Sequence, residues 1–143
     1  MIEIREGELD LAVQLSQQIP EFSDPYPKQI YLERLKNNAS LILTAYFNNE
    51  YAGFKIGYSL DNSVFYSWMG GVLPNLRRSG IGYELANYQE NWAIKNGYQK
   101  IRLKTRKKHQ AMIQFSLKRQ FEIIEEIPRI PEEETRLIME KNL

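Results

Sequence analysis

The chain has 143 residues, the size of one domain, and its 43% hydrophobic and 12% aromatic residues can supply a buried core. The 19 lysine and arginine residues nearly balance 18 acidic ones, so net charge favours neither nucleic acid nor an anionic membrane as partner. The absence of cysteine excludes disulfides, thiol nucleophiles and thiolate metal sites, and a single histidine disfavours a histidine-built metal site. We therefore expect one metal-free cytoplasmic domain over residues 1–143, without a signal peptide or membrane span.

The N-terminal residues predict a strand followed by a helix. Ile2 and Ile4 alternate with charged residues, as in a short half-buried strand. Leu11, Leu15 and Ile19 then recur at helical spacing. The chain is therefore expected to begin with a strand and a helix.

A proline-rich loop and three strands are expected next. Prolines between residues 20 and 27 interrupt helix formation before a second short helix over residues 30–35. Residues 41–47 form a continuous apolar run, residues 51–59 alternate, and residues 64–69 are rich in β-branched and aromatic side chains. Short turns separate these runs, which predicts three consecutive antiparallel strands.

The second half predicts helix, strand, helix and two closing strands. Apolar residues recur at helical spacing from Ile81 to Trp92, and Gly97 marks the end of that helix. Further elements are expected as a strand around 101–103, a helix over 109–118 and strands over 121–127 and 135–141. The predicted fold is mixed α/β, with a largely antiparallel central sheet of about seven strands flanked by about four helices.

The turn between the strand at residues 64–69 and the following helix carries the clearest chemical signal. Gly80 and Gly82 remove side chains there, so backbone N–H groups can converge on an anion at the positive end of the helix dipole. Such a turn favours a phosphate or pyrophosphate. Tyr83 and Glu84 follow Gly82 where a P-loop has lysine and serine or threonine, and the three glycines of a Rossmann turn are missing.

The run Val72-x-Pro74-x-x-Arg77-x-x-Gly80-x-Gly82 closely resembles the acetyl-coenzyme A signature of the GNAT N-acetyltransferase family. The predicted order of elements is also similar to that family's, so the resemblance covers nearly the whole chain. It implies acetyl-coenzyme A (acetyl-CoA) as co-substrate, with its pyrophosphate held by the backbone of the turn. The coenzyme-binding residues that it implies are Gly70, Gly71, Val72, Leu73, Arg77, Arg78, Ser79, Gly80, Ile81, Gly82, Tyr83 and His109.

The resemblance also implies a reaction. An amine attacks the acetyl carbonyl directly in a ternary complex, so the enzyme forms no covalent intermediate. A backbone N–H at Met69, Gly70 or Gly71 is expected to polarise the carbonyl. The adjacent glycines fit either a bulge that splays the neighbouring strands or a flexible strand end.

The last helix and the residues that follow it depart from the family pattern at four positions. Anchoring this segment on Phe121 puts His109, Met112, Ser116 and Gln120 where the family has asparagine, alanine, its proton-donating tyrosine and glycine. Ser116 is either a proton relay through water or a packing residue, and His109 either a coenzyme contact or a helix-start residue. These departures leave two alternatives open: a non-catalytic acyl-CoA-binding module that has lost the general acid, and a nucleotide-binding interaction domain.

Candidates for the acceptor side come from the proline-rich loop. Glu21 and Asp24 are candidate general bases acting through water, or else solvated loop carboxylates. Tyr26 and Tyr31 are candidates to line the acceptor pocket, or else packing residues. The expected partner is a small-molecule or peptide amine, and the protein is expected to be a monomer or homodimer.

Alternating charges mark the fifth strand. Lys100, Arg102 and Lys104 share one face of it, and Arg102 and Lys104 are candidate substrate contacts. Three uses stay open: the 3′-phosphate of the coenzyme, an acidic group on the acceptor, or a solvated face. No nucleic-acid recognition motif accompanies these charges, so we do not expect a nucleic-acid partner.

Overall fold

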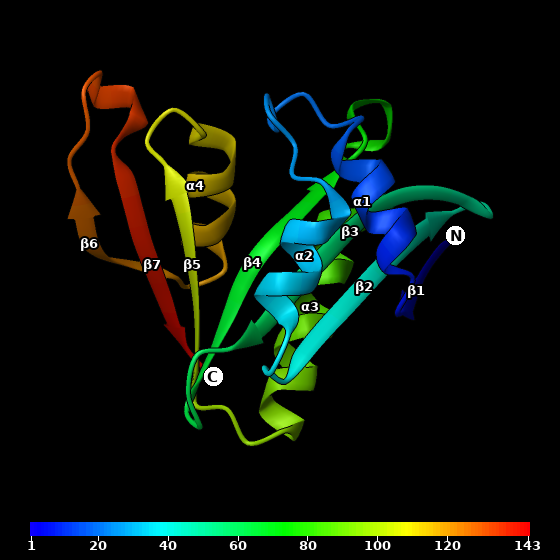
Figure 1. Ribbon diagram of the computed structural model, residues 1–143, viewed down its shortest axis with the longest axis horizontal. Helices are drawn as coiled ribbons and strands as arrows, with labels where there is room; N and C mark the ends of the chain where they lie inside the picture. Colours follow the sequence, from blue (N-terminus) through cyan, green and yellow to red (C-terminus); the bar gives the residue numbers. More distant parts are fainter.

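The computed structural model describes residues 1–143 and joins seven strands into one sheet, in the order β1-β2-β3-β4-β5-β7-β6 (Figure 1). The predicted mixed α/β class and the predicted order of elements are confirmed. The strands are β1 (Ile2–Glu6), β2 (Ser40–Phe47), β3 (Glu50–Ser59), β4 (Val64–Val72), β5 (Lys100–Arg106), β6 (Glu122–Ile127) and β7 (Arg136–Asn142). The helices are α1 (Leu9–Ser16), α2 (Lys28–Leu35), α3 (Ile81–Lys95) and α4 (Gln110–Lys118), with 3-10 turns η1 (Pro74–Leu76) and η2 (Glu132–Glu134).

The sheet is antiparallel at every pair of neighbouring strands except one. Strands β1 to β4 form an antiparallel group, as do β5, β7 and β6. Strands β4 and β5 join the two groups and are parallel. A parallel pair needs a long crossover, which α3 supplies.

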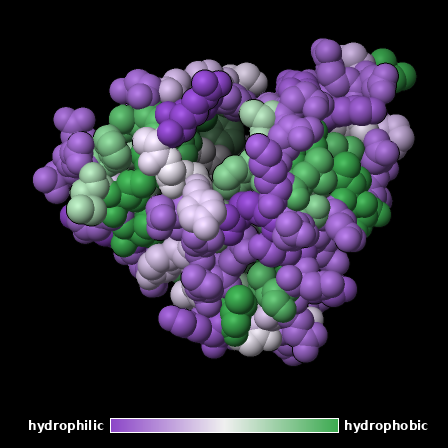
Figure 2. Space-filling view, turned by 180° about the vertical axis from the view of Figure 1, so that it is seen from behind, coloured by the Kyte–Doolittle hydropathy of each residue, from purple (hydrophilic) through white to green (hydrophobic).

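Two hydrophobic cores lie on opposite faces of the sheet. Helices α1 and α2 cover one face, where Tyr31 packs with Phe54 and Ile56 of β3. Helix α3 covers the other face, where Ile81 and Leu85 belong to the larger core. The face of the molecule opposite to that in Figure 1 carries a hollow near its upper middle, bordered by both hydrophilic and hydrophobic residues (Figure 2).

Strands β4 and β5 pair over only part of their length. The parallel ladder joins Val64–Ser67 to Lys100–Leu103, yet β4 continues to Val72 and β5 to Arg106. The two strands lie side by side at one end and separate toward the other (Figure 1). The sheet therefore contains a gap between its two antiparallel groups.

A β-bulge lies where the ladder ends. The consecutive β3 residues Ile56 and Gly57 pair with Met69 and Ser67, so Trp68 is an extra residue in β4. Because the bulge shifts the alternation, both Trp68 and Met69 pack on the face covered by α1 and α2. A bulge at Gly70 and Gly71 was one of the two alternatives for the glycine pair, and that alternative is wrong, because the bulge lies at Trp68.

The two glycines themselves pair regularly with β3. Gly70 lies opposite Lys55, and Gly71 lies opposite Phe54. A Cβ at Gly71 would approach Cδ1 of Ile19 to 2.8 Å. Glycine at position 71 is therefore explained by close packing of the segment after α1, not by a bulge.

Gly57 of β3 is also closely packed, against β4, and its substitution gives a test of the packing between these two strands. A Cβ there would lie 2.4 Å from Cε2 of Phe65 and 2.7 Å from the carbonyl oxygen of Tyr66. Gly57→Ala should therefore lower the free energy of unfolding by about 1–3 kcal/mol, measured by denaturant titration. Gly82→Ala is the matched control, because its Cβ would meet nothing closer than 4.0 Å and alanine favours a helix. Equal stability of Gly57→Ala and the wild type would contradict the packing described here.

Candidate functional site

The turn before α3 presents an unbroken row of free backbone donors. Gly80 is the N-cap of α3 and has φ 90°, a left-handed conformation that favours glycine. The first helical bond runs from the N–H of Glu84 to the carbonyl oxygen of Gly80, at 3.0 Å. The six N–H groups of residues 78–83 make no hydrogen bond within the protein. With the helix dipole behind them, these donors suit a multiply charged anion.

Two side chains shape this turn without using its N–H groups. Arg77 donates from Nε to the carbonyl oxygen of Val72 at 3.0 Å, which ties the turn to the end of β4. The Ser79 hydroxyl donates to the carbonyl oxygen of Leu76. Both bonds satisfy carbonyl groups, so the backbone donors remain available.

Arg77 also joins the turn to the proline-rich loop. Its guanidinium donates to both carboxylate oxygens of Glu21, at 2.9 and 2.7 Å. This hydrogen bonding lowers the pKa of Glu21 and keeps it ionised at neutral pH. Asp24, the other candidate base, is exposed and makes no hydrogen bond or ion pair. Of the two carboxylates, only Glu21 is built into the site.

His109 lies at the N-cap of α4, on the other side of the gap between β4 and β5. Burial lowers its pKa, as do Lys108 and Arg106, so the imidazole is neutral at neutral pH. Glu21 and His109 are close enough to influence each other's pKa. The proline-rich loop and the start of α4 therefore lie within electrostatic range of each other.

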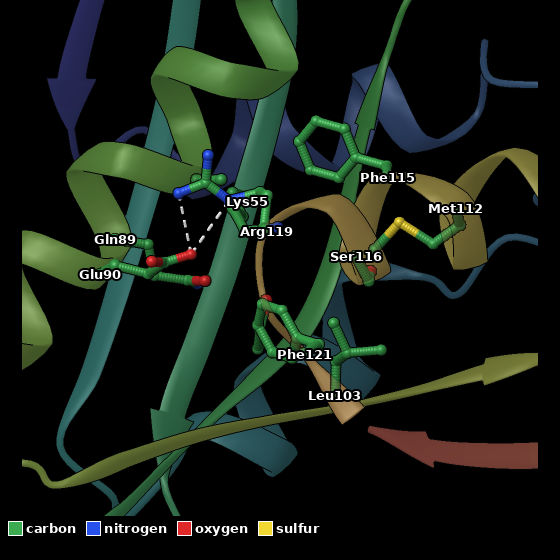
Figure 3. A pocket seen from close by; sticks show the side chains of 11 residues that line it. Lys55, Gln89, Glu90, Leu103, Met112, Phe115, Ser116, Arg119 and Phe121 are labelled. Atoms are coloured by element: carbon green, nitrogen blue, oxygen red, sulfur yellow. Dashed lines mark hydrogen bonds and ion pairs between the residues drawn. The ribbon is translucent and has the colours of Figure 1, made fainter. Parts of the chain in front are cut away.

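Ser116 lines a small cavity between the sheet, α3 and α4. Its side chain is 1% exposed, and its hydroxyl has no hydrogen-bond partner. Lys55, Gln89 and Ser116 border the cavity from β3, α3 and α4 (Figure 3). The sequence analysis missed Lys55, although it is a single charge within an otherwise uncharged strand, Tyr51 to Ser59.

An aromatic cluster covers the opposite face of β4. The Trp68 ring stacks on Tyr26 at 6.1 Å between centroids and lies 5.2 Å from Tyr31 and 5.9 Å from Tyr58. The Arg34 guanidinium lies over Trp68, 4.8 Å from the ring centroid. Tyr26 is 41% exposed, whereas Tyr31 is fully buried. Tyr26 can therefore meet a ligand directly, and Tyr31 supports Trp68 from within.

Acidic side chains pair with most of the cations on and after β5. Arg102 donates to Glu140 on β7 at 2.7 and 2.9 Å, and Lys100 lies 3.4 Å from the same carboxylate. Lys104, by contrast, is exposed and makes no ion pair. Of the three alternating charges, Lys104 alone is free.

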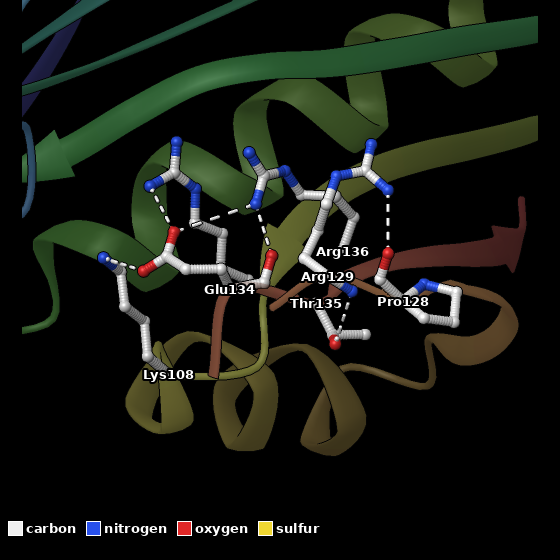
Figure 4. Close-up of polar contacts among 7 residues, drawn as sticks. Lys108, Pro128, Arg129, Glu134, Thr135 and Arg136 are labelled. Atoms are coloured by element: carbon white, nitrogen blue, oxygen red, sulfur yellow. Dashed lines mark hydrogen bonds and ion pairs between the residues drawn. The ribbon is translucent and has the colours of Figure 1, made fainter. Parts of the chain in front are cut away.

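A second acidic residue gathers the cations beyond the end of β5. Glu134 pairs with Arg106 at 3.0 Å and with Lys108 at 2.6 Å, and its carboxylate lies 3.8 Å from the Arg136 guanidinium (Figure 4). Lys107 pairs separately with Glu132.

The structure contains no group of three histidine, cysteine or acidic side chains arranged to hold a metal ion. None of its helices combines the length and apolar character needed to cross a bilayer.

Comparison with known proteins gives the family. A sequence model of the acetyltransferase (GNAT) family matches residues 10–121, so the chain belongs to that family. The predicted family is confirmed, and the class of protein is an acyl-CoA-dependent N-acetyltransferase. No curated protein sequence matches the chain.

Solved structures share the fold at low sequence identity. The ribosomal-protein-S18-alanine N-acetyltransferase from Escherichia coli has a TM-score of 0.85 and 19% identity, covering 99% of this chain and 94% of its own. A GNAT family acetyltransferase from Elizabethkingia anophelis, with acetyl-CoA bound, has a TM-score of 0.79 and 17% identity, covering 99% and 98%. An aminoglycoside 6'-N-acetyltransferase complexed with coenzyme A has a TM-score of 0.79 and 18% identity, covering 98% and 96%.

A substitution at Gly80 tests the turn. Gly80→Val should abolish measurable acetyl-CoA binding in a calorimetric titration, because a β-branched residue tolerates φ 90° poorly and its side chain would enter the space before the free donors. The fold should survive, since the nearest atom to a Cβ at this position is 3.7 Å away. A folded variant with wild-type affinity would show that the anion binds elsewhere.

Proposed function

We propose that this protein transfers the acetyl group of acetyl-CoA to an amine by direct attack in a ternary complex. The observation that carries the proposal is the row of six unpaired N–H groups at residues 78–83, beside the gap between β4 and β5. A pyrophosphate with two negative charges fits such a row. Coenzyme A and acetyl-CoA in structures of the same fold support this assignment.

The gap offers backbone groups to the rest of the coenzyme. Strand β5 pairs with β4 only as far as Ser67, so alternate N–H and C=O groups of residues 68–72 face the gap without a strand partner. We expect the pantetheine arm to take these groups, with an N–H at Met69, Gly70 or Gly71 polarising the thioester carbonyl. Backbone donors held by the sheet need little reorganisation during the reaction, which favours the developing oxyanion.

The attacking amine must be neutral, and Glu21 is the better placed of the two candidate bases. It lies beside Arg77 and within electrostatic reach of His109, whereas Asp24 has no contact. We assign Glu21 to accepting the proton of the amine through water, because it is the one of the two carboxylates that is held in place, by Arg77. His109 is assigned to contact the coenzyme at the gap between β4 and β5.

The acceptor is expected to approach from the face covered by α1 and α2. Tyr26 and Trp68 supply an aromatic wall there, with Tyr31 behind them. Arg102 faces the same side, because it pairs in register with Tyr66 of β4. Arg102 pairs with Glu140, which leaves Lys104 as the cation on this strand without an acidic partner, available for an acidic group on the acceptor.

Thiol release separates catalysis from binding alone. The protein should be incubated with acetyl-CoA and a panel of amines that includes amino acids, phosphate-bearing amines, peptides and polyamines. Coenzyme release that depends on the amine supports the transferase. Binding of acetyl-CoA without release by any amine would instead indicate a non-catalytic acyl-CoA-binding module. At a hundred times its Kd, the coenzyme should stabilise the fold by about 2.7 kcal/mol, which a melting curve resolves.

Lys104 predicts the charge of the preferred amine. Acceptors with a carboxylate or phosphate should exceed polyamines in kcat/KM, and Lys104→Ala should lower kcat/KM for the acidic acceptor about ten- to a hundred-fold. Arg102→Ala should have a smaller effect, because Arg102 already pairs with Glu140. Unchanged kinetics in Lys104→Ala would reject the acidic acceptor, and a loss of acetyl-CoA affinity would assign the charge to the 3′-phosphate.

A further inference from the structure

The last turn of α2 carries an arginine without an acidic partner. Arg34 is exposed, and its guanidinium makes no ion pair. Arg77 and Arg102, which belong to the same site, each pair with a carboxylate. The helix dipole favours a positive charge at this end of α2, but a lysine would serve it equally well. The helix end alone therefore does not explain why position 34 carries an arginine.

Two aromatic residues hold the Arg34 guanidinium in place. It lies over the Trp68 ring, 4.8 Å from the centroid, and its Nη1 donates a hydrogen bond of 3.2 Å to the Tyr58 hydroxyl. Tyr58 is itself buried, and its ring meets Trp68 edge to face at 5.9 Å between centroids. A guanidinium has several N–H donors, and Tyr58 takes one of them. The other donors are held in position without a partner in the protein.

The guanidinium lies at the edge of the gap in the sheet. Trp68, on which it stacks, is the extra residue of the bulge and directly follows Ser67, the last residue of β4 that pairs with β5. The Trp68 side chain packs on the face covered by α1 and α2, from which the acceptor is expected to approach. The N–H groups assigned to the thioester carbonyl belong to the next residues, 69–71. An anion bound by Arg34 would therefore lie within a few residues of the reacting carbonyl.

Further aromatic side chains complete the surface around Arg34. Tyr26 stacks on Trp68 and is partly exposed. The Tyr66 ring lies 5.4 Å from that of Tyr58, and the Tyr66 hydroxyl makes no hydrogen bond within the protein. Burial raises the pKa of Tyr66 to about 12, so its hydroxyl keeps its proton at neutral pH and can donate. An aromatic wall thus adjoins a fixed cation and a free hydroxyl.

We propose that Arg34 determines acceptor specificity by binding a carboxylate of the acceptor, whose apolar part packs against Tyr26 and Trp68. This inference rests on the proposed function. A planar guanidinium can donate two parallel N–H bonds to the two oxygens of a carboxylate, which an ammonium cannot do. Lys104 supplies a second positive charge from β5, but no protein contact fixes its ammonium. The acceptor class is therefore an amine with a carboxylate and an apolar body, such as an apolar amino acid or a short peptide that ends in one.

Pairs of acceptors that differ in this one group test the assignment. Phenylalanine and glycylphenylalanine should each be compared with the corresponding carboxamide by thiol release, in the wild type and in Arg34→Met. For at least one pair, Arg34→Met should lower kcat/KM for the acid about ten- to a hundred-fold and leave kcat/KM for the carboxamide nearly unchanged. Each substrate is compared between enzymes, so the different pKa values of the amines do not affect the result. Arg34→Lys should recover part of the loss, because it keeps the charge without the planar fork.

Arg5 provides the matched control. Its guanidinium also stacks on an aromatic ring, 4.0 Å from the centroid of Tyr46, but it lies on β1 at the far edge of the sheet. Arg5→Met should therefore keep the wild-type kcat/KM for acids and carboxamides. An equal loss for acid and carboxamide in Arg34→Met would show that Arg34 only supports the fold, and it would overturn the proposal. Unchanged kcat/KM for both acids in Arg34→Met would overturn it as well.

Binding of a product tests the site without turnover. N-acetylphenylalanine should be titrated by calorimetry into the protein saturated with coenzyme A, and its carboxamide should bind at least about ten-fold more weakly. Arg34→Met should remove this difference. Equal binding of the two compounds by the wild type would overturn the role of Arg34. The expected binding without thiol release by any amine would instead reject the proposed transferase and leave the carboxylate site standing.

Discussion

The gap in the sheet exists because the β4–β5 ladder ends before either strand does. These strands hold the two antiparallel groups of the sheet together over Val64–Ser67 and Lys100–Leu103, and they separate beyond that point. The extra residue Trp68 allows β4 to keep its pairing with β3 while it bends away from β5. The loss of hydrogen bonds between the two strands leaves backbone groups unpaired in the gap, which is where a substrate can replace them. The bulge thus lies where β4 stops pairing with β5 and its backbone groups become available to a ligand.

The side chains around the turn before α3 leave its backbone N–H groups unpaired. Arg77 and Ser79 satisfy carbonyl groups around the turn, so the N–H groups of residues 78–83 keep their full capacity for an anion. Glu140 and Glu134 each pair with more than one cation on and after β5, and Lys104 makes no ion pair.

The sequence predicted the parts of the fold that depend on local pattern. The glycines at 80 and 82, the helical stripe that follows them and the order of strands are all visible within short windows, and the structure confirms these elements. The position of the bulge depends on register between β3 and β4, which no local pattern specifies. The same reason hides the contacts of Arg77 with Glu21 and of Arg102 with Glu140, which join residues 56 and 38 positions apart. Lys55 is different, because a lone charge in an apolar strand is a signal that could be recognised.

Amide chemical shifts recorded with and without coenzyme A test the central claim most directly. The account predicts that the largest shifts fall on the N–H groups of residues 78–83, since these donors have no partner in the free protein. Smaller shifts should follow along residues 68–72, where β4 faces the gap. Tight binding with unchanged resonances for residues 78–83, and with shifts confined to the basic residues on β5, would contradict the account.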